Sequence, residues 1–173
     1  TGGLGHIGSY LVRNLSKDLP LTEILVLDSL MTQRFSSLFR LPPIPRVRFY
    51  ERDTRDIDIP FLSQLGPIDY VVHLSALTDA SGTLEKREFL FGNNLDSTKL
   101  IAQVCVELNI PLIFPSTTSV YGSQSSLVDE ACDELLPQSP YAECKLEEEK
   151  VIREAVIQGL RAVTLRFGTI HGV

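Results

Sequence analysis

A tyrosine and a lysine four residues apart, Tyr141 and Lys145, form the pair in this sequence with the most direct chemical use. On a helix this spacing stacks both side chains on one face, about 6 Å apart. A positive charge beside a phenol favours the phenolate, so we expect Lys145 to lower the pKa of Tyr141 towards neutrality. A tyrosinate can take the proton of an alcohol while hydride leaves for an oxidising cofactor. Taken alone, the pair is equally consistent with two ordinary helix-surface residues.

A run of hydroxyl side chains, Ser116 to Ser119, follows the apolar segment Ile110–Phe114. At the tip of a strand, the Thr117 hydroxyl can hydrogen-bond a substrate oxygen and a phenolate together. The alternative for this run is a Ser/Thr turn.

The helix that carries Tyr141 has a start signal of its own. Ser139 is a favoured N-cap and Pro140 a favoured first-turn residue. Further along this helix we expect Glu147 to Glu149 to form an exposed acidic face.

The chain opens on a glycine loop that runs into a helix. Gly2, Gly5 and Gly8 form G-x-x-G-x-x-G, and apolar residues at helical spacing follow. Such a loop lets the backbone approach a pyrophosphate and places that anion at a helix N-terminus. The alternative is a plain turn.

Two aspartates follow apolar segments at positions where a dinucleotide is bound. Asp28 ends the run Glu23–Asp28, where a carboxylate can accept hydrogen bonds from ribose hydroxyls and would repel a 2'-phosphate. This favours NAD over NADP, although Asp28 could instead cap the next helix. Asp53 could hydrogen-bond an adenine amino group or form a turn.

A third apolar run, Asp69–Leu74, ends in the small residues Ser75 and Ala76, which allow a dinucleotide to pass close over a strand end. His73 lies within this run, without other metal-ligating residues nearby. We therefore expect it to be a core or supporting residue and expect no metal site.

Apolar runs alternate with helical patterns along the whole chain, which predicts one doubly wound α/β domain, residues 1–173, with a parallel sheet of Rossmann type. The expected strands are Glu23–Asp28, Val47–Glu51, Asp69–Leu74, Ile110–Phe114 and Arg161–Phe167. The expected helices follow Gly8, lie within Leu30–Arg46 and Ile57–Leu65, span Asn93–Leu108 and begin at Pro140, with loops at Thr78–Glu88 and Gln124–Gln138.

Composition narrows the class of protein. The 173 residues carry a formal net charge of -6, which argues against a general nucleic-acid binder. No apolar run approaches the roughly 20 residues that span a bilayer, so we expect a cytoplasmic protein without membrane contact. Cys105, Cys132 and Cys144 lack metal-type spacing and are expected to be free thiols.

With these motifs placed, the chain resembles the extended short-chain dehydrogenase/reductase family, within its NAD-dependent nucleotide-sugar epimerase and dehydratase branch. The resemblance covers the whole chain and rests on the joint order of the motifs. These are Thr1-Gly-Gly-x-Gly-x-Ile-Gly8, Asp28-Ser-Leu, Asp53-Thr54, Val72-His-Leu-Ser-Ala76, Asn94-x-x-x-Thr98, Ser116-Thr-Thr-Ser-Val-Tyr-Gly122, Tyr141-x-x-x-Lys145 and Leu165-Arg-Phe-Gly168.

The resemblance implies a role for each matching residue. Thr117 takes the place of the catalytic Ser/Thr, Tyr141 that of the acid/base, and Lys145 that of the lysine that also holds the nicotinamide ribose. The implied cofactor-binding residues are Gly2, Gly5, His6, Ile7, Gly8, Asp28, Ser29, Asp53, Thr54, Leu74, Ser75, Ala76, Asn94 and Lys145. It also implies a homodimer formed through the helices at 93–108 and 141–157.

Within the branch, the resemblance favours a nucleotide-sugar 4-epimerase that works through a 4-keto intermediate. Dehydratases of the branch follow the catalytic Thr with Asp-Glu, where this chain has Thr118 and Ser119. Family members begin with a strand before the glycine loop and continue into a substrate domain, so we expect both to lie outside this chain. The alternatives are a dehydrogenase, reductase or dehydratase acting on another sugar or alcohol, and a non-catalytic NAD-binding regulatory protein.

Overall fold

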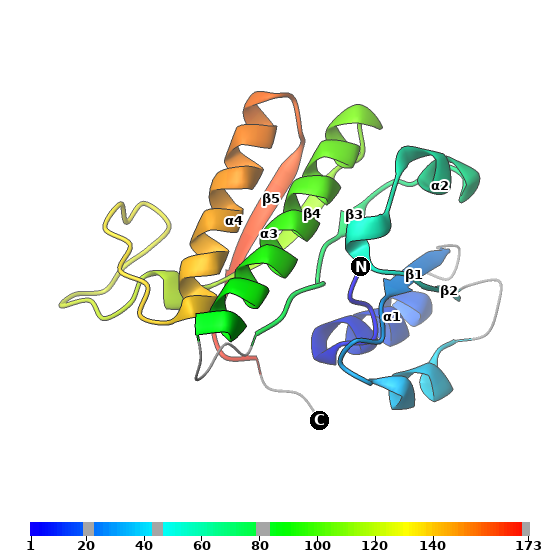
Figure 1. The fold of residues 1–173 in the computed structure, drawn as a ribbon, viewed down its shortest axis with the longest axis horizontal. Coiled ribbons are helices and arrows are strands. Elements are labelled where there is room, and N and C mark those ends of the chain that lie inside the picture. The colour runs from blue at the N-terminus through cyan, green and yellow to red at the C-terminus, as the bar shows by residue number, and fades with distance from the viewer. Residues whose placement is uncertain (19–22, 43–46, 79–83, 171–173) are drawn as a thin grey trace.

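The structure is a computed structural model that describes residues 1–18, 23–42, 47–78 and 84–170. It is an α/β fold whose strand pairs are all parallel (Figure 1). The strands are β1 (Ile24–Asp28), β2 (Val47–Glu51), β3 (Val71–Val72), β4 (Leu112–Thr117) and β5 (Ala162–Phe167). The helices are α1 (His6–Asp18), α2 (Ile59–Gln64), α3 (Leu84–Glu107) and α4 (Pro140–Ile157), with 3-10 turns η1 (Phe35–Arg40), η2 (Thr54–Asp56) and η3 (Thr118–Val120).

The described strands form two sheets, β1-β2 and β3-β4-β5, where the sequence predicted one. Thr1 and Gly2 lie between them. The Thr1 N–H donates to Val72 O (2.8 Å), the Leu74 N–H donates to Thr1 O (3.1 Å), and the Gly2 N–H donates to Leu27 O (2.8 Å). Two residues make too few ladder hydrogen bonds to count as a strand, so the sheets remain separate although both contact the same segment.

Helices cover both faces of the fold, as the alternation of elements predicted. Successive residues of β1 point to opposite sides. Val26 packs in a cluster with Val12 of α1, whereas Leu27 packs in a second cluster with Ile101 of α3 and Ile152 of α4. Figure 1 shows α3 and α4 side by side over β4 and β5.

Several element boundaries differ from the sequence prediction, and strand β3 (Val71–Val72) is shorter than the expected strand Asp69–Leu74. Helix α3 begins at Leu84 and therefore includes most of the described part of the expected Thr78–Glu88 loop, whose residues 79–83 lie outside the described residues. Strand β4 continues past Pro115 to Thr117. Pairing of β4 with β3 ends at Ile113, so by strand alternation the missing N–H of Pro115 faces a side without a ladder.

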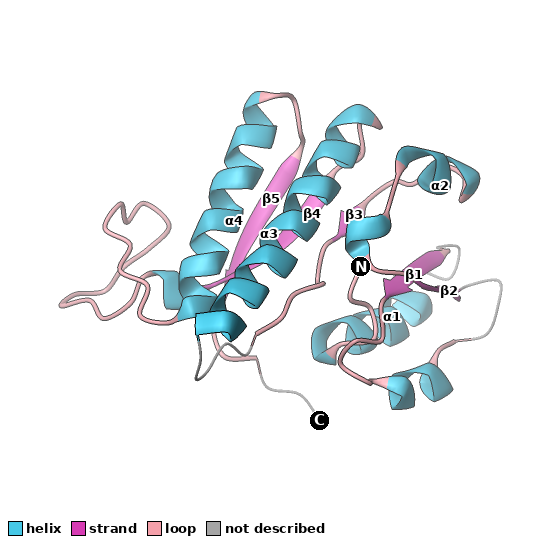
Figure 2. Ribbon diagram, viewed as in Figure 1, coloured by secondary structure: helices cyan, strands magenta, loops and turns pink. Residues whose placement is uncertain are grey.

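The segment between η3 and α4 is a long loop, as predicted for Gln124–Gln138 (Figure 2). It ends at Ser139, whose hydroxyl accepts a hydrogen bond from the Ala142 N–H at 3.1 Å. This N-cap and Pro140 start α4 where the sequence predicted and fix Tyr141 in its first turn. The expected short helix within Leu30–Arg46 is η1, and residues 43–46 lie outside the described part.

Candidate active site

The glycine loop lies against the end of β3. A Cβ at Gly2, whose φ is +64°, would lie 2.5 Å from the Ser75 backbone nitrogen. A Cβ at Gly8 would lie 2.5 Å from Gly2 O. Both distances are too short for any side chain, so glycine is required for the loop to close on itself and on the neighbouring strand end.

A pocket opens beside this loop. Its lining residues come from the loop, from the segments after β1, β2 and β3, and from α3. They are Gly2, Gly5, Asp28, Ser29, Met31, Thr32, Asp53, Leu74, Ser75, Ala76, Leu77 and Asn93. Backbone of small residues, two carboxylates and the adjacent start of α1 form a surface that fits a dinucleotide, with its pyrophosphate over the glycines.

Asp28 links the loop to the carboxyl end of β1. One carboxylate oxygen accepts from the Leu4 N–H (3.0 Å), and the other accepts from the Leu30 N–H (2.9 Å). A carboxylate oxygen has two acceptor sites, so each retains one for a ribose hydroxyl. The position is therefore consistent with the predicted ribose contact.

Asp53 lines the same pocket but already has strong partners. Its carboxylate caps η2 and forms a two-point ion pair with Arg55, with N···O distances of 3.0 and 2.7 Å. Hydrogen bonding by Arg55 holds the pKa of Asp53 below its usual value. Asp53 therefore has the turn-forming role that the sequence left open. Its neighbour Thr54 is buried and does not line the pocket.

The predicted cofactor residues of α1 and α3 fall into two groups. His6 and Ile7 begin α1 but do not line the pocket. Asn94 is fully buried, and its amide holds the Leu77 backbone through hydrogen bonds of 2.8 and 2.9 Å. Its neighbour Asn93 lines the pocket, which the sequence analysis missed although the Asn-Asn doublet marks the place.

Thr117 ends β4, where it pairs with Phe167 of β5. Its hydroxyl accepts from the Ser119 N–H (3.2 Å) and donates to the Ser119 hydroxyl (3.1 Å). The Ser/Thr turn that the sequence allowed is therefore present. It fixes the Thr117 hydroxyl at the carboxyl end of the strand.

Tyr141 and Lys145 share one face of α4, with the ammonium 6.0 Å from the centroid of the phenol ring. The expected lowering of the phenol pKa is wrong for this structure. Burial, reinforced by the charge of Glu148, raises the pKa of Tyr141 to about 12. The ammonium instead forms an ion pair with Glu148 at 3.2 Å.

The acidic face expected at Glu147 to Glu149 is also wrong for two of its three members. Glu147 pairs at the surface with Lys150, but Glu148 is fully buried and Glu149 is 5% exposed. Both inward residues lie one helical turn after Lys145, and this spacing was the sequence signal for their orientation.

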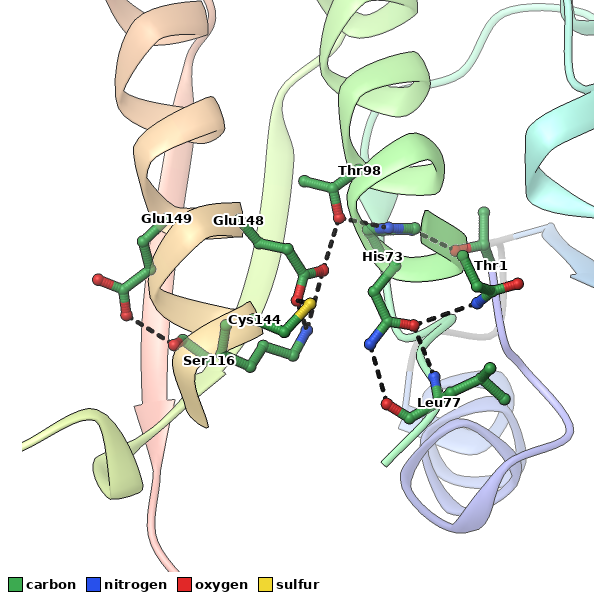
Figure 3. Close-up of polar contacts among 11 residues, drawn as sticks. Thr1, His73, Leu77, Thr98, Ser116, Cys144, Glu148 and Glu149 are labelled. Atoms are coloured by element: carbon green, nitrogen blue, oxygen red, sulfur yellow. Dashed lines mark hydrogen bonds and ion pairs between the residues drawn. The ribbon is translucent and has the colours of Figure 1, made fainter. Parts of the chain in front are cut away.

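His73 is a buried supporting residue, as predicted. Thr98 donates its hydroxyl proton to Glu148 (2.7 Å), so His73 Nε2–H is the donor in its 3.3 Å contact with Thr98. Its Nδ1 then accepts from the Thr1 hydroxyl at 2.7 Å. Figure 3 shows the contacts of His73 with Thr1 and Thr98. Burial holds the pKa of His73 well below 6.5, and the ring is neutral.

Glu149 ties α4 to two strands. It accepts from the Ser116 hydroxyl (2.6 Å) and from Arg166 through two N–H groups (3.0 and 2.7 Å). Burial alone would raise the pKa of Glu149, but the hydrogen bonds from Arg166 and Ser116 hold it below 4.5. Because Ser116 precedes Thr117, this network also fixes the strand end that carries the predicted catalytic hydroxyl.

Comparison with known proteins identifies the family. The sequence model of the NAD dependent epimerase/dehydratase family matches residues 1–173. The chain belongs to this family. It is 32% identical over 176 residues to the UDP-glucose 4-epimerase of Lacticaseibacillus casei, covering 99% of this chain and 50% of that protein.

Solved structures agree with this membership. The UDP-glucuronic acid 4-epimerase of Bacillus cereus in complex with NAD matches with a TM-score of 0.87 and 28% identity, over 99% of this chain and 56% of that one. The dTDP-glucose 4,6-dehydratase of Streptomyces venezuelae with NAD bound matches with a TM-score of 0.81 and 31% identity, over 95% of this chain and 53% of that one. This family member therefore spans about half the length of the curated relatives it matches.

Three further expectations concern other classes of site. Cys105, Cys132 and Cys144 are free thiols, and burial raises the pKa of Cys105 to about 11 and that of Cys144 to about 12. Among the described residues no cluster of His, Cys, Asp and Glu could hold a metal ion. No helix within the described ranges has both the length and the apolar character needed to cross a bilayer.

Proposed function

We propose that this chain is the NAD-binding and catalytic part of a nucleotide-sugar 4-epimerase. The observation that carries the proposal is the placement of Thr117 at the end of β4 and of Tyr141 and Lys145 in the first turns of α4. The dinucleotide pocket follows the carboxyl ends of β1, β2 and β3, and ligands of parallel sheets bind at that edge.

These residues divide the work of oxidising and reducing an alcohol. Tyr141 takes the proton of the sugar hydroxyl at C4, while Thr117 hydrogen-bonds the same oxygen. NAD, held over the glycine loop and beside Asp28, would supply a hydride acceptor for oxidation at C4 and a hydride donor for reduction from the opposite face. Tyr141 then gives the proton back, so the reaction inverts one centre and consumes no cofactor.

Two observations favour epimerisation over loss of water. Dehydration needs a second acid/base pair, and Thr118 and Ser119 beside the predicted catalytic Thr117 are hydroxyl residues, not carboxylates. The curated and solved relatives named above include two 4-epimerases of UDP-sugars. A UDP-sugar is therefore the substrate class that we expect first.

The assembly and location of the protein follow the same proposal. We expect a cytoplasmic homodimer formed through α3 and α4, on which Phe89, Val156 and Ile157 expose apolar side chains. Analytical ultracentrifugation of the full-length protein measures the oligomeric state.

The experiment is turnover of UDP-sugars by the full-length protein, following both the sugar product and NADH. We expect C4 inversion without accumulation of NADH, and Tyr141→Phe to lower the rate by about 10²–10⁴ while NAD binding persists. The matched control is Tyr70→Phe, since Tyr70 is 67% exposed. NADH formed in proportion to product would indicate a dehydrogenase. Near-normal turnover of Tyr141→Phe would contradict the role of Tyr141 as the acid/base.

A further inference from the structure

A fully buried carboxylate, Glu148, lies where α4 packs against α3. Acidic side chains are almost never fully buried unless they are paired. Its partner is Lys145, itself only 3% exposed, with Nζ at 3.3 Å from one carboxylate oxygen and 3.2 Å from the other. The pair is therefore held away from water. In the protein interior an ion pair interacts more strongly than at the surface.

The remaining contacts of Glu148 are also inside the protein. The Thr98 hydroxyl donates to it at 2.7 Å, and the Cys144 thiol lies 3.9 Å away (Figure 3). The Lys145 ammonium in turn lies 4.6 Å from the centroid of the Phe114 ring. These contacts hold Glu148 in one orientation, with its charge directed at the lysine.

This arrangement determines which group receives the charge of Lys145. The ammonium is within ion-pair distance of Glu148 but 6.0 Å from the ring centroid of Tyr141. Besides burial, Glu148 is the largest cause that raises the pKa of Tyr141. A lysine without this carboxylate would act on the phenol in the opposite direction.

We propose that Glu148 is a positioning residue, a buried counter-ion that holds Lys145 and withholds the lysine's positive charge from Tyr141. The inference rests on the proposed function in taking Tyr141 as the acid/base of the reaction. It assigns to Glu148 the control of how readily that residue ionises. Lys145 must then turn from Glu148 towards the phenol for proton transfer to occur near neutral pH.

Other titratable groups near this pair do not replace it. His73, beyond Thr98, is neutral because it is buried. Burial keeps the Cys144 thiol protonated, with a pKa of about 12. From α3 the facing side chain is the uncharged Thr98, and from β4 it is Phe114. The Glu149 carboxylate is compensated by Arg166.

The test is a spectroscopic titration of Tyr141 in the full-length protein without NAD. The ultraviolet absorbance of tyrosinate is measured against pH, and the same curve for the Tyr141→Phe form of each variant is subtracted. In Glu148→Gln we expect the pKa of Tyr141 to fall by about one. At about pH 10 this gives about tenfold more Tyr141 tyrosinate than in the parent. The matched control is Glu147→Gln on the same helix, whose partner Lys150 is at the surface, and it should titrate like the parent.

Two outcomes overturn the proposal: Glu148→Gln titrates like the parent, or Glu147→Gln shifts as far. If Glu148→Gln does not fold, Glu148→Asp keeps the charge but withdraws it by one methylene, and a smaller shift in the same direction is expected. No shift in that variant would also overturn the inference. The titration uses no substrate, so its result is separate from the turnover of Tyr141→Phe, which tests the proposed function.

Discussion

At the scale of single residues, the glycine loop depends on space that no side chain can share. We predict that Gly8→Ala weakens NAD binding at least tenfold and lowers the free energy of unfolding by about 1–3 kcal/mol, because a Cβ would lie 2.5 Å from Gly2 O. Calorimetric titration with NAD and urea unfolding measure the two effects.

The matched control is Gly92→Ala in α3. A Cβ at Gly92 meets no atom within 4 Å, and alanine is the better helix former by about 1 kcal/mol. This variant should bind NAD normally and be as stable as the parent or more so. Equal effects of the two substitutions would contradict the requirement for glycine at position 8.

Sequence reasoning was strongest at these residues, where one residue type fits one backbone geometry. It was weakest at Tyr141, because the pKa of a phenol depends on every charge around it and on burial. The position of Lys145 beside Tyr141 could be predicted from their four-residue spacing on the helix. Glu148 was predicted to face solvent, although its spacing from Lys145 places both on one face of the helix, and the structure shows that this face packs against α3.

At the scale of elements, the Glu149 network joins α4 to β4 and β5. The pKa of Glu149 is depressed in the folded state, so its stabilising contribution is present above the unfolded value of 4.5 and is lost as pH falls through the folded value. We predict that Glu149→Gln costs about 1–3 kcal/mol near neutral pH, because Arg166 loses its carboxylate. Urea unfolding from about pH 7 into the acid range measures this.

The difference between parent and Glu149→Gln should shrink as pH falls, since protonation removes the same charge in the parent. The control Glu147→Gln removes an exposed pair and should cost no more than about 1 kcal/mol. Parallel curves for the parent and Glu149→Gln over the whole pH range would show that the network does not contribute in this way.

Element boundaries were predictable only where a local signal marks them. Ser139 and Pro140 marked the start of α4, and the structure confirms it. The start of α3 at Leu84 was missed, although Thr83 directly before it is a residue type that favours the N-cap position. The continuation of β4 through Pro115 is possible because its pairing with β3 ends at Ile113. The end of that pairing depends on β3 and cannot be predicted from the β4 segment itself.

At the scale of the whole molecule, the two sheets meet at Thr1 and Gly2 and at the dinucleotide pocket. Asp28 and Ser29 line that pocket from the sheet β1-β2, whereas Leu74 to Ala76 line it from the sheet β3-β4-β5. The alternation of elements predicted a parallel α/β fold. It could not predict that a segment as short as Thr1 and Gly2 is hydrogen-bonded to both described sheets, because pairing partners are set by tertiary structure.

A ligand that contacts both sheets should therefore stabilise both. We predict that NAD at about 100 times its dissociation constant adds about 2.7 kcal/mol to the stability of the full-length protein. Hydrogen–deuterium exchange should slow in β1-β2 and in β3-β4-β5 together. AMP carries only the adenosine half, and because Asp28 and Asp53 follow β1 and β2, it should protect the first sheet alone. Protection by NAD confined to β1-β2 would mean that the nicotinamide half does not reach the strand ends beside Thr117, and the proposed hydride transfer would lose its geometric basis.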